Sequence, residues 1–261
     1  NLSIQNFEFN FVDAILKLST EKLPKLAFLL GHGELDQYES GDIDKKLSEY
    51  YDTYRVEING DIKALEPYKV VIIAGPQKPF PEADKLVIDQ YIMQGGKVLW
   101  FVDPVSVSID SLSQGSTALA YVNQHNLDDQ LFKYGVRLNA SLVQDMQSTV
   151  IPVNTSLPGQ EPRFSPLQWV YYPLLSSSEG NPITRNLNMI KSQFISPIDT
   201  VGGNGEIIKT ILLKTSPYSR IVNVPLFVSL AEISRRPTER EFTRSNIPVA
   251  VLLEGKFESV F

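Results

Sequence analysis

The sequence predicts an α/β fold, in which a three-layer sandwich with a mainly parallel sheet over residues 1–145 precedes a β-rich region over 146–261. Apolar segments at 26–30, 70–74 and 97–102, of which only the last contains a charged residue, Lys97, alternate with helical patterns in the first part. Such an alternation is typical of a parallel sheet whose strands are buried on both faces. The later apolar runs are short, rich in β-branched and aromatic residues and separated by prolines, which is typical of strands and loops.

The composition restricts the classes of partner and of chemistry. The formal net charge of the 261 residues is -6, so the chain lacks the basic surface that binds nucleic acids and anionic membranes. There is no cysteine, which excludes disulfides, thiolate nucleophiles and sulfur-ligated metals. No uncharged apolar run approaches the roughly 20 residues that cross a bilayer. We therefore expect no nucleic-acid partner, and membrane contact only through segments outside this chain.

The first elements of the chain are expected to be a helix, a strand, a helix and a strand. An amphipathic pattern over 12–18 predicts a short helix that ends before Pro24. The apolar run 26–30 is the first strand. Acidic residues that favour a helix start precede a helical pattern over 42–51, and a short strand is expected over 55–58.

Glycines and prolines then mark the ends of the next elements. After the strand at 70–74, a helix is expected from about residue 82 to Gly95, where a left-handed residue ends it. The strand 97–102 follows directly. The Ser- and Gln-rich stretch 106–124 is expected to be a loop, and a helix is expected over 127–134.

The second half is expected to consist mainly of strands and loops. Whether its last strand pairs with the main sheet is left open. The glycine-rich segment 202–205 favours a hairpin turn. The aromatic residues Trp169, Tyr171 and Tyr172 suit either an exposed docking patch or a core, and the core is the favoured interpretation. Further strands are expected at 136–138, 142–145, 150–153, 168–172, 207–213 and 247–253.

The candidate site lies where the parallel strands end. The first strand runs into a turn in which glycines flank His32 and Glu34, and the next two strands end at Gly75 and Asp103. Ligands of open α/β sheets bind beyond the carboxyl ends of the strands. We therefore expect His32, Glu34, Gly75 and Asp103 to form a binding site at one sheet edge. Replacing His32 and Glu34 together by alanine is expected to leave folding intact and to weaken partner assembly.

Catalytic and metal-binding interpretations have less support. With two histidines in the chain a multi-histidine metal site is excluded, and the acidic residues after Glu34 do not have the spacing of a calcium loop. Neither a Gly-x-Ser-x-Gly turn nor a phosphate-binding glycine motif occurs, so no catalytic residue, metal or cofactor is expected. A hydrolase that uses His32, Glu34 and Asp103, with Ser106 as its nucleophile, and a solute-binding protein both remain as alternatives.

Seven segments, taken in order, resemble a known family. They are Phe28–Glu34, Val71–Pro76, Asp89–Pro104, Leu131–Val136, Ser196–Asp199, Leu212–Ser219 and Val249–Ser259. Together they resemble the soluble domain of the gliding-associated ABC transporter auxiliary component of the GldG type, over roughly residues 25 to 261.

The resemblance implies a fold, a location and a set of partners. It implies a relative of the class I glutamine amidotransferase-like, or flavodoxin-like, α/β fold that has lost the catalytic cysteine. It also implies a non-enzymatic periplasmic domain of an inner-membrane protein, which works with a separate permease and ATPase in gliding motility. An envelope protein or glycan is the expected ligand of the strand-end site, and homo-oligomerisation is left open.

Overall fold

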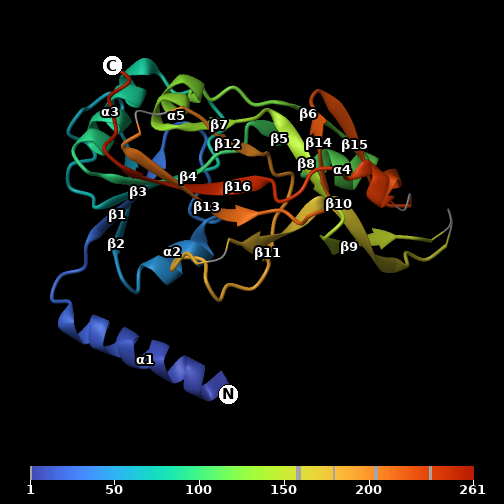
Figure 1. Cartoon of the computed structure of the whole chain (residues 1–261), viewed down its shortest axis with the longest axis horizontal. Coiled ribbons are helices and arrows are strands. Elements are labelled where there is room, and N and C mark those ends of the chain that lie inside the picture. The colour runs from blue at the N-terminus through green and yellow to red at the C-terminus, as the bar shows by residue number, and fades with distance from the viewer. Residues whose placement is uncertain (1, 157–159, 179, 203–204, 235–236) are drawn as a thin grey trace. The chain divides into compact units, whose positions relative to one another are not determined.

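The computed structural model (Figure 1) describes residues 2–156, 160–178, 180–202, 205–234 and 237–261. The chain forms two compact units, of which the first comprises residues 1–102 with Phe261 and the second comprises residues 103–260. The expected division into domains at residue 145 stays a prediction. Among the described residues, no helix is both long enough and apolar enough to span a bilayer.

The first unit is built on a four-stranded parallel sheet with the strand order β2-β1-β3-β4. This confirms the expected mixed α/β architecture with a parallel sheet. The predicted strands at 26–30, 70–74 and 97–102 correspond closely to β1, β3 and β4. The expectation that 97–102 is buried on both faces is wrong, because β4 is an edge strand in which Leu99 and Phe101 are 45% and 49% exposed. The elements of this unit are α1 (Leu2–Ser19), β1 (Lys25–Leu30), α2 (Gly41–Leu47), β2 (Asp52–Glu57), β3 (Val70–Ala74), α3 (Glu82–Met93) and β4 (Lys97–Phe101).

The central strands of this sheet are buried on both faces. On one face, Leu26, Phe28, Ile72 and Ala74 form an apolar cluster against which Leu47 of α2 packs. Alternate residues of the same strands point to the other side and are also buried, as are apolar residues of α3. Figure 1 shows α2 and α3 on opposite sides of the sheet. Uninterrupted apolar strands are needed because neither face is open to water.

The second unit consists mainly of antiparallel strands, as the sequence predicts for its later part. Its sheets have the orders β11-β10-β13-β16 with β9 on β10, β15-β6-β5, β12-β7 and β14-β8. The elements are β5 (Val105–Val107), α4 (Ile109–Gly115), β6 (Thr117–Val122), α5 (Asp128–Tyr134), β7 (Val136–Leu138), β8 (Ser141–Asp145), β9 (Ser148–Asn154), β10 (Phe164–Ser177), β11 (Ile190–Lys191), β12 (Ile198–Thr200), β13 (Ile207–Lys214), β14 (Ser219–Asn223), β15 (Leu226–Ser229), η1 (Leu230–Ser234), η2 (Glu239–Glu241) and β16 (Pro248–Gly255).

The second unit differs from the sequence-based expectations for a loop and for the last strand, and a third expectation, a hairpin turn, lies partly outside the described residues. The stretch 106–124 is not a loop, because it contains β5, α4 and β6. The last strand does not join the parallel sheet, because β16 pairs antiparallel with β13. Of the proposed hairpin turn 202–205, residues 203–204 lie outside the described part of the chain, and the flanking strands β12 and β13 pair with other strands.

The core of the second unit confirms the interpretation of the aromatic residues as buried. Trp169, Tyr171, Tyr172 and Phe194 are all buried in one cluster with apolar residues of β5, β6, β8 and β15. The rings of Trp169 and Phe194 meet edge to face, with centroids 5.5 Å apart. Such aromatic contacts stabilise a core beyond the area that they bury. These side chains are therefore not a docking patch.

A buried polar cluster joins the end of β8 to the loop after β13. The Asp145 side chain is 0% exposed. It accepts hydrogen bonds from the Ser216 amide at 2.7 Å, the Ser216 hydroxyl at 2.6 Å, the Ser219 hydroxyl at 3.0 Å and the Gln147 amide at 2.7 Å. A buried carboxylate is tolerated when its oxygens are fully hydrogen-bonded in this way. Asp145 thus connects segments about seventy residues apart in sequence.

Candidate functional site

His32 lies in the turn after β1 and is held between two carboxylates. Its Nδ1 is 3.1 Å from Oε1 of Glu34, and its Nε2 is 2.9 Å from Oδ2 of Asp84 in α3. The other Glu34 oxygen accepts a hydrogen bond from the His32 amide at 2.7 Å. The other Asp84 oxygen accepts one from the Gly60 amide at 2.7 Å. Both nitrogens of the imidazole and all four carboxylate oxygens therefore have partners within the protein.

The imidazole of His32 is also shielded from water. The residue is 4% exposed, and its ring stacks on Phe80 with the centroids 3.8 Å apart and the planes 13° apart. The sequence predicts that the turn presents His32 to a ligand, but the structure buries it. The role of His32 and Glu34 in binding stays a prediction. Their contacts explain how the turn is held in place but do not identify a ligand.

The turn after β1 is joined to the segment after β3. The carbonyl oxygen of His32 accepts hydrogen bonds from the amides of Gln77 and Lys78, each at 2.8 Å. Gly33 has a φ of 77°, and a Cβ atom there would lie 3.2 Å from Cβ of Gln77. The backbone angle and the close approach both favour glycine. The strand ends at Gly31 and Gly75 thus lie at the same sheet edge, as parallel strands require.

Gly75 and Asp103 have different places in the structure. The Gly75 amide donates to the carbonyl oxygen of Phe101 at 2.8 Å, so the end of β3 lies beside the end of β4. Asp103 is exposed and is the first residue of the second unit. Its place in a common site with His32 remains a prediction.

The residues that the sequence analysis missed at this edge are Phe80 and Asp84. Both lie about fifty residues after His32, at or just before the start of α3. Asp84 has the position of an acidic residue in a first helical turn, where a negative charge favours the helix dipole. That sequence signal explains the helix start but does not identify the partner of the carboxylate.

The two carboxylates change the protonation of His32. Burial of the imidazole opposes its charge, but the hydrogen bonds to Glu34 and Asp84 outweigh that effect and raise the pKa of His32 above 6.5. A histidine whose pKa is higher in the folded than in the unfolded state stabilises the fold fully below the unfolded pKa. This stabilisation is lost as the pH rises through the folded pKa.

The stability of the first unit is therefore expected to fall, through deprotonation of His32, as the pH rises above the ordinary histidine pKa of about 6.5. The free energy of unfolding, measured by denaturant titration at several pH values, tests this expectation. In His32→Gln the decline is expected to be smaller, because glutamine does not titrate. An equal decline in both proteins would show that other groups cause it.

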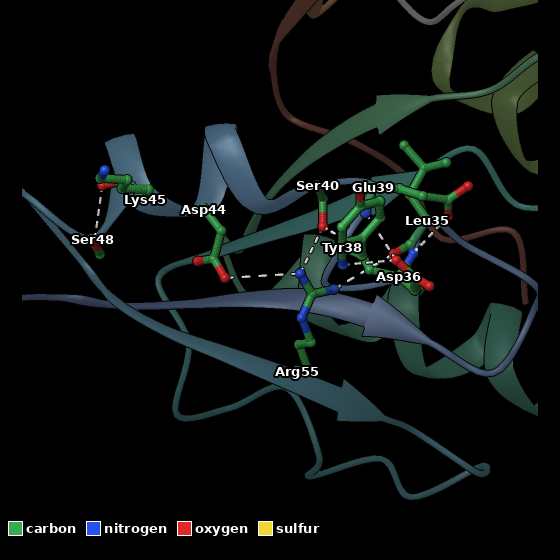
Figure 2. Close-up of polar contacts among 9 residues, drawn as sticks. All are labelled: Leu35, Asp36, Tyr38, Glu39, Ser40, Asp44, Lys45, Ser48 and Arg55. Carbon is green, nitrogen blue, oxygen red and sulfur yellow. Dashed lines mark hydrogen bonds and ion pairs between the residues drawn. The ribbon is translucent and has the colours of Figure 1, made fainter.

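A second set of polar contacts supports the loop that follows Glu34 (Figure 2). Asp36 Oδ1 accepts hydrogen bonds from the amides of Tyr38 and Glu39 at 2.8 and 2.9 Å, and Glu39 Oε2 accepts one from the Asp36 amide at 3.0 Å. This reciprocal arrangement is that of a capping box. The Ser40 hydroxyl adds a bond to the Asp36 carbonyl at 2.5 Å. The loop consequently enters α2 with most of its local donors satisfied.

Arg55 of β2 supports the same loop from the sheet. Its guanidinium donates to the Ser40 hydroxyl at 2.6 Å and lies 3.8 Å from the Asp44 carboxylate (Figure 2). It also lies over the Phe28 ring, 5.0 Å from the centroid. A planar guanidinium can stack and donate several hydrogen bonds at once, which lysine cannot do. Arg55 therefore ties the loop to the sheet.

The geometry offers little for metal binding or nucleophilic catalysis. Within the described ranges, no group of three histidine, cysteine, aspartate or glutamate side chains is arranged to hold a metal ion. Ser108, one of the two serines near a strand end, accepts a hydrogen bond from the Ser111 amide at 3.1 Å and so caps α4. Ser106 lies in β5. The hydrolase alternative with Ser106 as its nucleophile stays a hypothesis.

Comparisons with known proteins bear on the family and the fold. The family described as an ABC-type uncharacterized transport system matches residues 23–261. No curated protein matches the chain. A solved structure described as the mmIFT52 N-terminal domain is similar, with a TM-score of 0.53 and 14% identity, over 87% of this chain and 86% of that chain. At this identity the likeness concerns the fold alone.

Proposed function

Because this chain belongs to the ABC-type uncharacterized transport system family, in which it is an auxiliary component, we propose that it is a non-enzymatic binding module of such a transporter. The family match over residues 23–261 is the observation that carries the proposal. In this function the chain holds a transporter subunit or an envelope ligand at the strand-end edge of its parallel sheet. Another polypeptide hydrolyses ATP.

The geometry at the strand ends supports binding over catalysis. A general base needs a nitrogen or oxygen that can reach a substrate. Both ring nitrogens of His32 instead face carboxylates of the same unit, and Phe80 covers the ring. Gly33 and the amides of Gln77 and Lys78 shape a compact turn at this edge. These contacts suit a rigid surface that a partner recognises.

The more specific role is proposed from the sequence resemblance. The chain serves as a GldG-type component in gliding motility, with its two units on the periplasmic side and its membrane anchors outside residues 1–261. Its partners there are the permease and ATPase subunits, with an envelope protein or glycan as a further ligand. The strand order β2-β1-β3-β4 and the absence of cysteine are compatible with a glutamine amidotransferase-like or flavodoxin-like ancestry.

A pull-down of the full-length, membrane-tethered protein from native membranes tests this function. We expect mass spectrometry to recover one permease and one ATPase together with the tagged protein. A tagged, unrelated membrane protein of similar abundance is the control for non-specific recovery. Recovery of neither subunit above that control would contradict the proposed function.

A further inference from the structure

An exposed aromatic side chain lies at the tip of the loop after β1. Tyr38 is 95% exposed, although tyrosine is a residue that proteins commonly bury at least in part. Leu35 and Ile43 on either side are 41% and 42% exposed. The acidic residues Asp36, Glu39 and Asp42 are exposed as well. We call this surface the Tyr38 knob, and it comprises Leu35, Asp36, Tyr38, Glu39, Asp42 and Ile43.

The Tyr38 knob is rigidly supported. The Asp36–Glu39 capping box fixes the backbone on both sides of Tyr38, and Arg55 connects the loop to the sheet through Ser40 (Figure 2). Ordering a flexible loop upon association reduces affinity, so a loop that is already ordered binds more tightly for the same contacts. Tyrosine has few rotatable bonds and is enriched at the energetic centres of interfaces. The knob thus has an aromatic centre on a preorganised support.

The charges of the Tyr38 knob determine which partner fits it. The knob carries the three exposed carboxylates of Asp36, Glu39 and Asp42. Of the two lysines of α2, Lys46 lies 3.2 Å from Glu49, and Lys45 is exposed, so the three carboxylates outnumber the one remaining positive charge. A second copy would bring an equally acidic knob, and the whole chain carries a net charge of -6. Like charges facing each other at an interface are unfavourable, whereas a basic surface would be attracted. The partner that matches is therefore a basic protein surface with an apolar recess for Tyr38.

We infer that the Tyr38 knob is the docking surface for the permease subunit, which contacts it through lysine or arginine side chains around an apolar recess. This inference rests on the proposed function, from which the identity of the partner comes. Tyr38 inserts between the basic side chains, and Leu35 and Ile43 extend the apolar contact. The carboxylates accelerate association and make the affinity sensitive to salt.

The test measures the affinity of the full-length protein for the purified permease–ATPase complex in lipid nanodiscs. Tyr38→Ala is expected to weaken binding by about 30-fold, the loss typical of a central aromatic contact. Tyr38→Phe keeps the ring and is expected to stay within about threefold. Asp42→Lys is expected to weaken binding by about tenfold and to reduce its dependence on salt concentration.

Asp110→Lys is the matched control for charge reversal. Asp110, like Asp42, is the exposed second residue of a seven-residue helix, but it lies in α4 of the second unit. We expect this variant to bind as tightly as the wild type. Circular dichroism and the denaturation midpoint of each variant establish that the fold is retained.

The possible outcomes distinguish a failure of the docking inference from a failure of the proposed function. If the wild type binds the complex and both Tyr38→Ala and Asp42→Lys bind equally well, the docking surface is elsewhere and the inference is overturned. If the wild type does not bind, the proposed function fails and the permease assignment of the knob fails with it. Self-association that Tyr38→Ala abolishes would identify a second copy as the occupant and would also overturn the inference.

Discussion

Asp145→Ala is expected to lower the free energy of unfolding of the second unit by about 4 kcal/mol. The substitution removes the common acceptor of four hydrogen bonds from Ser216, Ser219 and Gln147. Each buried donor that is left without a partner costs about 1–3 kcal/mol. Water has limited access to the cluster, because Asp145 and Ser219 are both 0% exposed.

The measurement is denaturant unfolding followed by tryptophan fluorescence. The two tryptophans lie in different units, Trp100 in β4 and Trp169 in β10, so Trp100→Phe leaves a reporter for the second unit alone. Asp199→Ala is the control, since Asp199 forms an exposed ion pair with Arg137 at 2.6 Å. Its expected cost is at most about 1 kcal/mol. Equal losses from Asp145→Ala and Asp199→Ala would contradict the structural role of the Asp145 cluster.

His32→Ala is expected to lower the stability of the first unit by about 3 kcal/mol. The substitution removes the partner that lies between the Glu34 and Asp84 carboxylates, and it removes the stacking on Phe80. Removing one partner of a buried ionic contact leaves the others uncompensated. The expectation that alanine at positions 32 and 34 leaves folding intact is therefore replaced by a loss of stability.

Hydrogen exchange read by mass spectrometry locates the effect of His32→Ala. Faster exchange is expected in the peptides that contain the turn after β1 and the start of α3, because His32 joins these segments. Lys78→Ala is the matched control at the same edge, since it leaves the backbone hydrogen bond to His32 in place. Its effect is expected to stay within about 0.5 kcal/mol. Unchanged exchange in His32→Ala would show that the contacts do not stabilise the edge.

The parallel sheet could be predicted from the sequence because its two central strands, β1 and β3, are buried on both faces. The runs Leu26–Leu30 and Val70–Ala74 contain no polar residue, and their length of five residues favours a buried strand over a buried helix. The end of the helix expected over 127–134 also has a local signal, because the next residue is Gly135, which ends α5 with a φ of 107°. Local signals of this kind need no knowledge of distant residues.

The region from β5 to β6 could not be predicted, because its pattern is weak. The inward-facing residues of β6 are the small Ala118 and Ala120, which give little hydrophobic contrast with their neighbours. Serines at 106, 108, 111 and 113 favour a loop by composition, although Ser108 acts as a helix cap. The same residue type thus indicates a loop or a helix start, and the residues after it decide between the two.

The candidate site could be predicted in part. Its place at the strand ends follows from a general rule for α/β sheets. The burial of His32 depends on Phe80 and Asp84, and the support of the loop at Tyr38 depends on Arg55. These contacts join segments that are far apart in sequence, and a single sequence has no local signal for them. The spacing of the acidic residues after Glu34 excludes a calcium loop but does not by itself predict that Asp36 and Glu39 form a capping box.

Photocrosslinking in native membranes tests most directly whether this chain is a docking module of an ABC transporter. The full-length protein carries p-benzoylphenylalanine in place of Tyr38 or, as the control, in place of Tyr121, which is also exposed but lies in β6. After irradiation, mass spectrometry is expected to identify permease peptides cross-linked to position 38 and not to position 121. Cross-links from neither position to any transporter subunit, with the protein present in the membrane at its normal level, would contradict the proposed function.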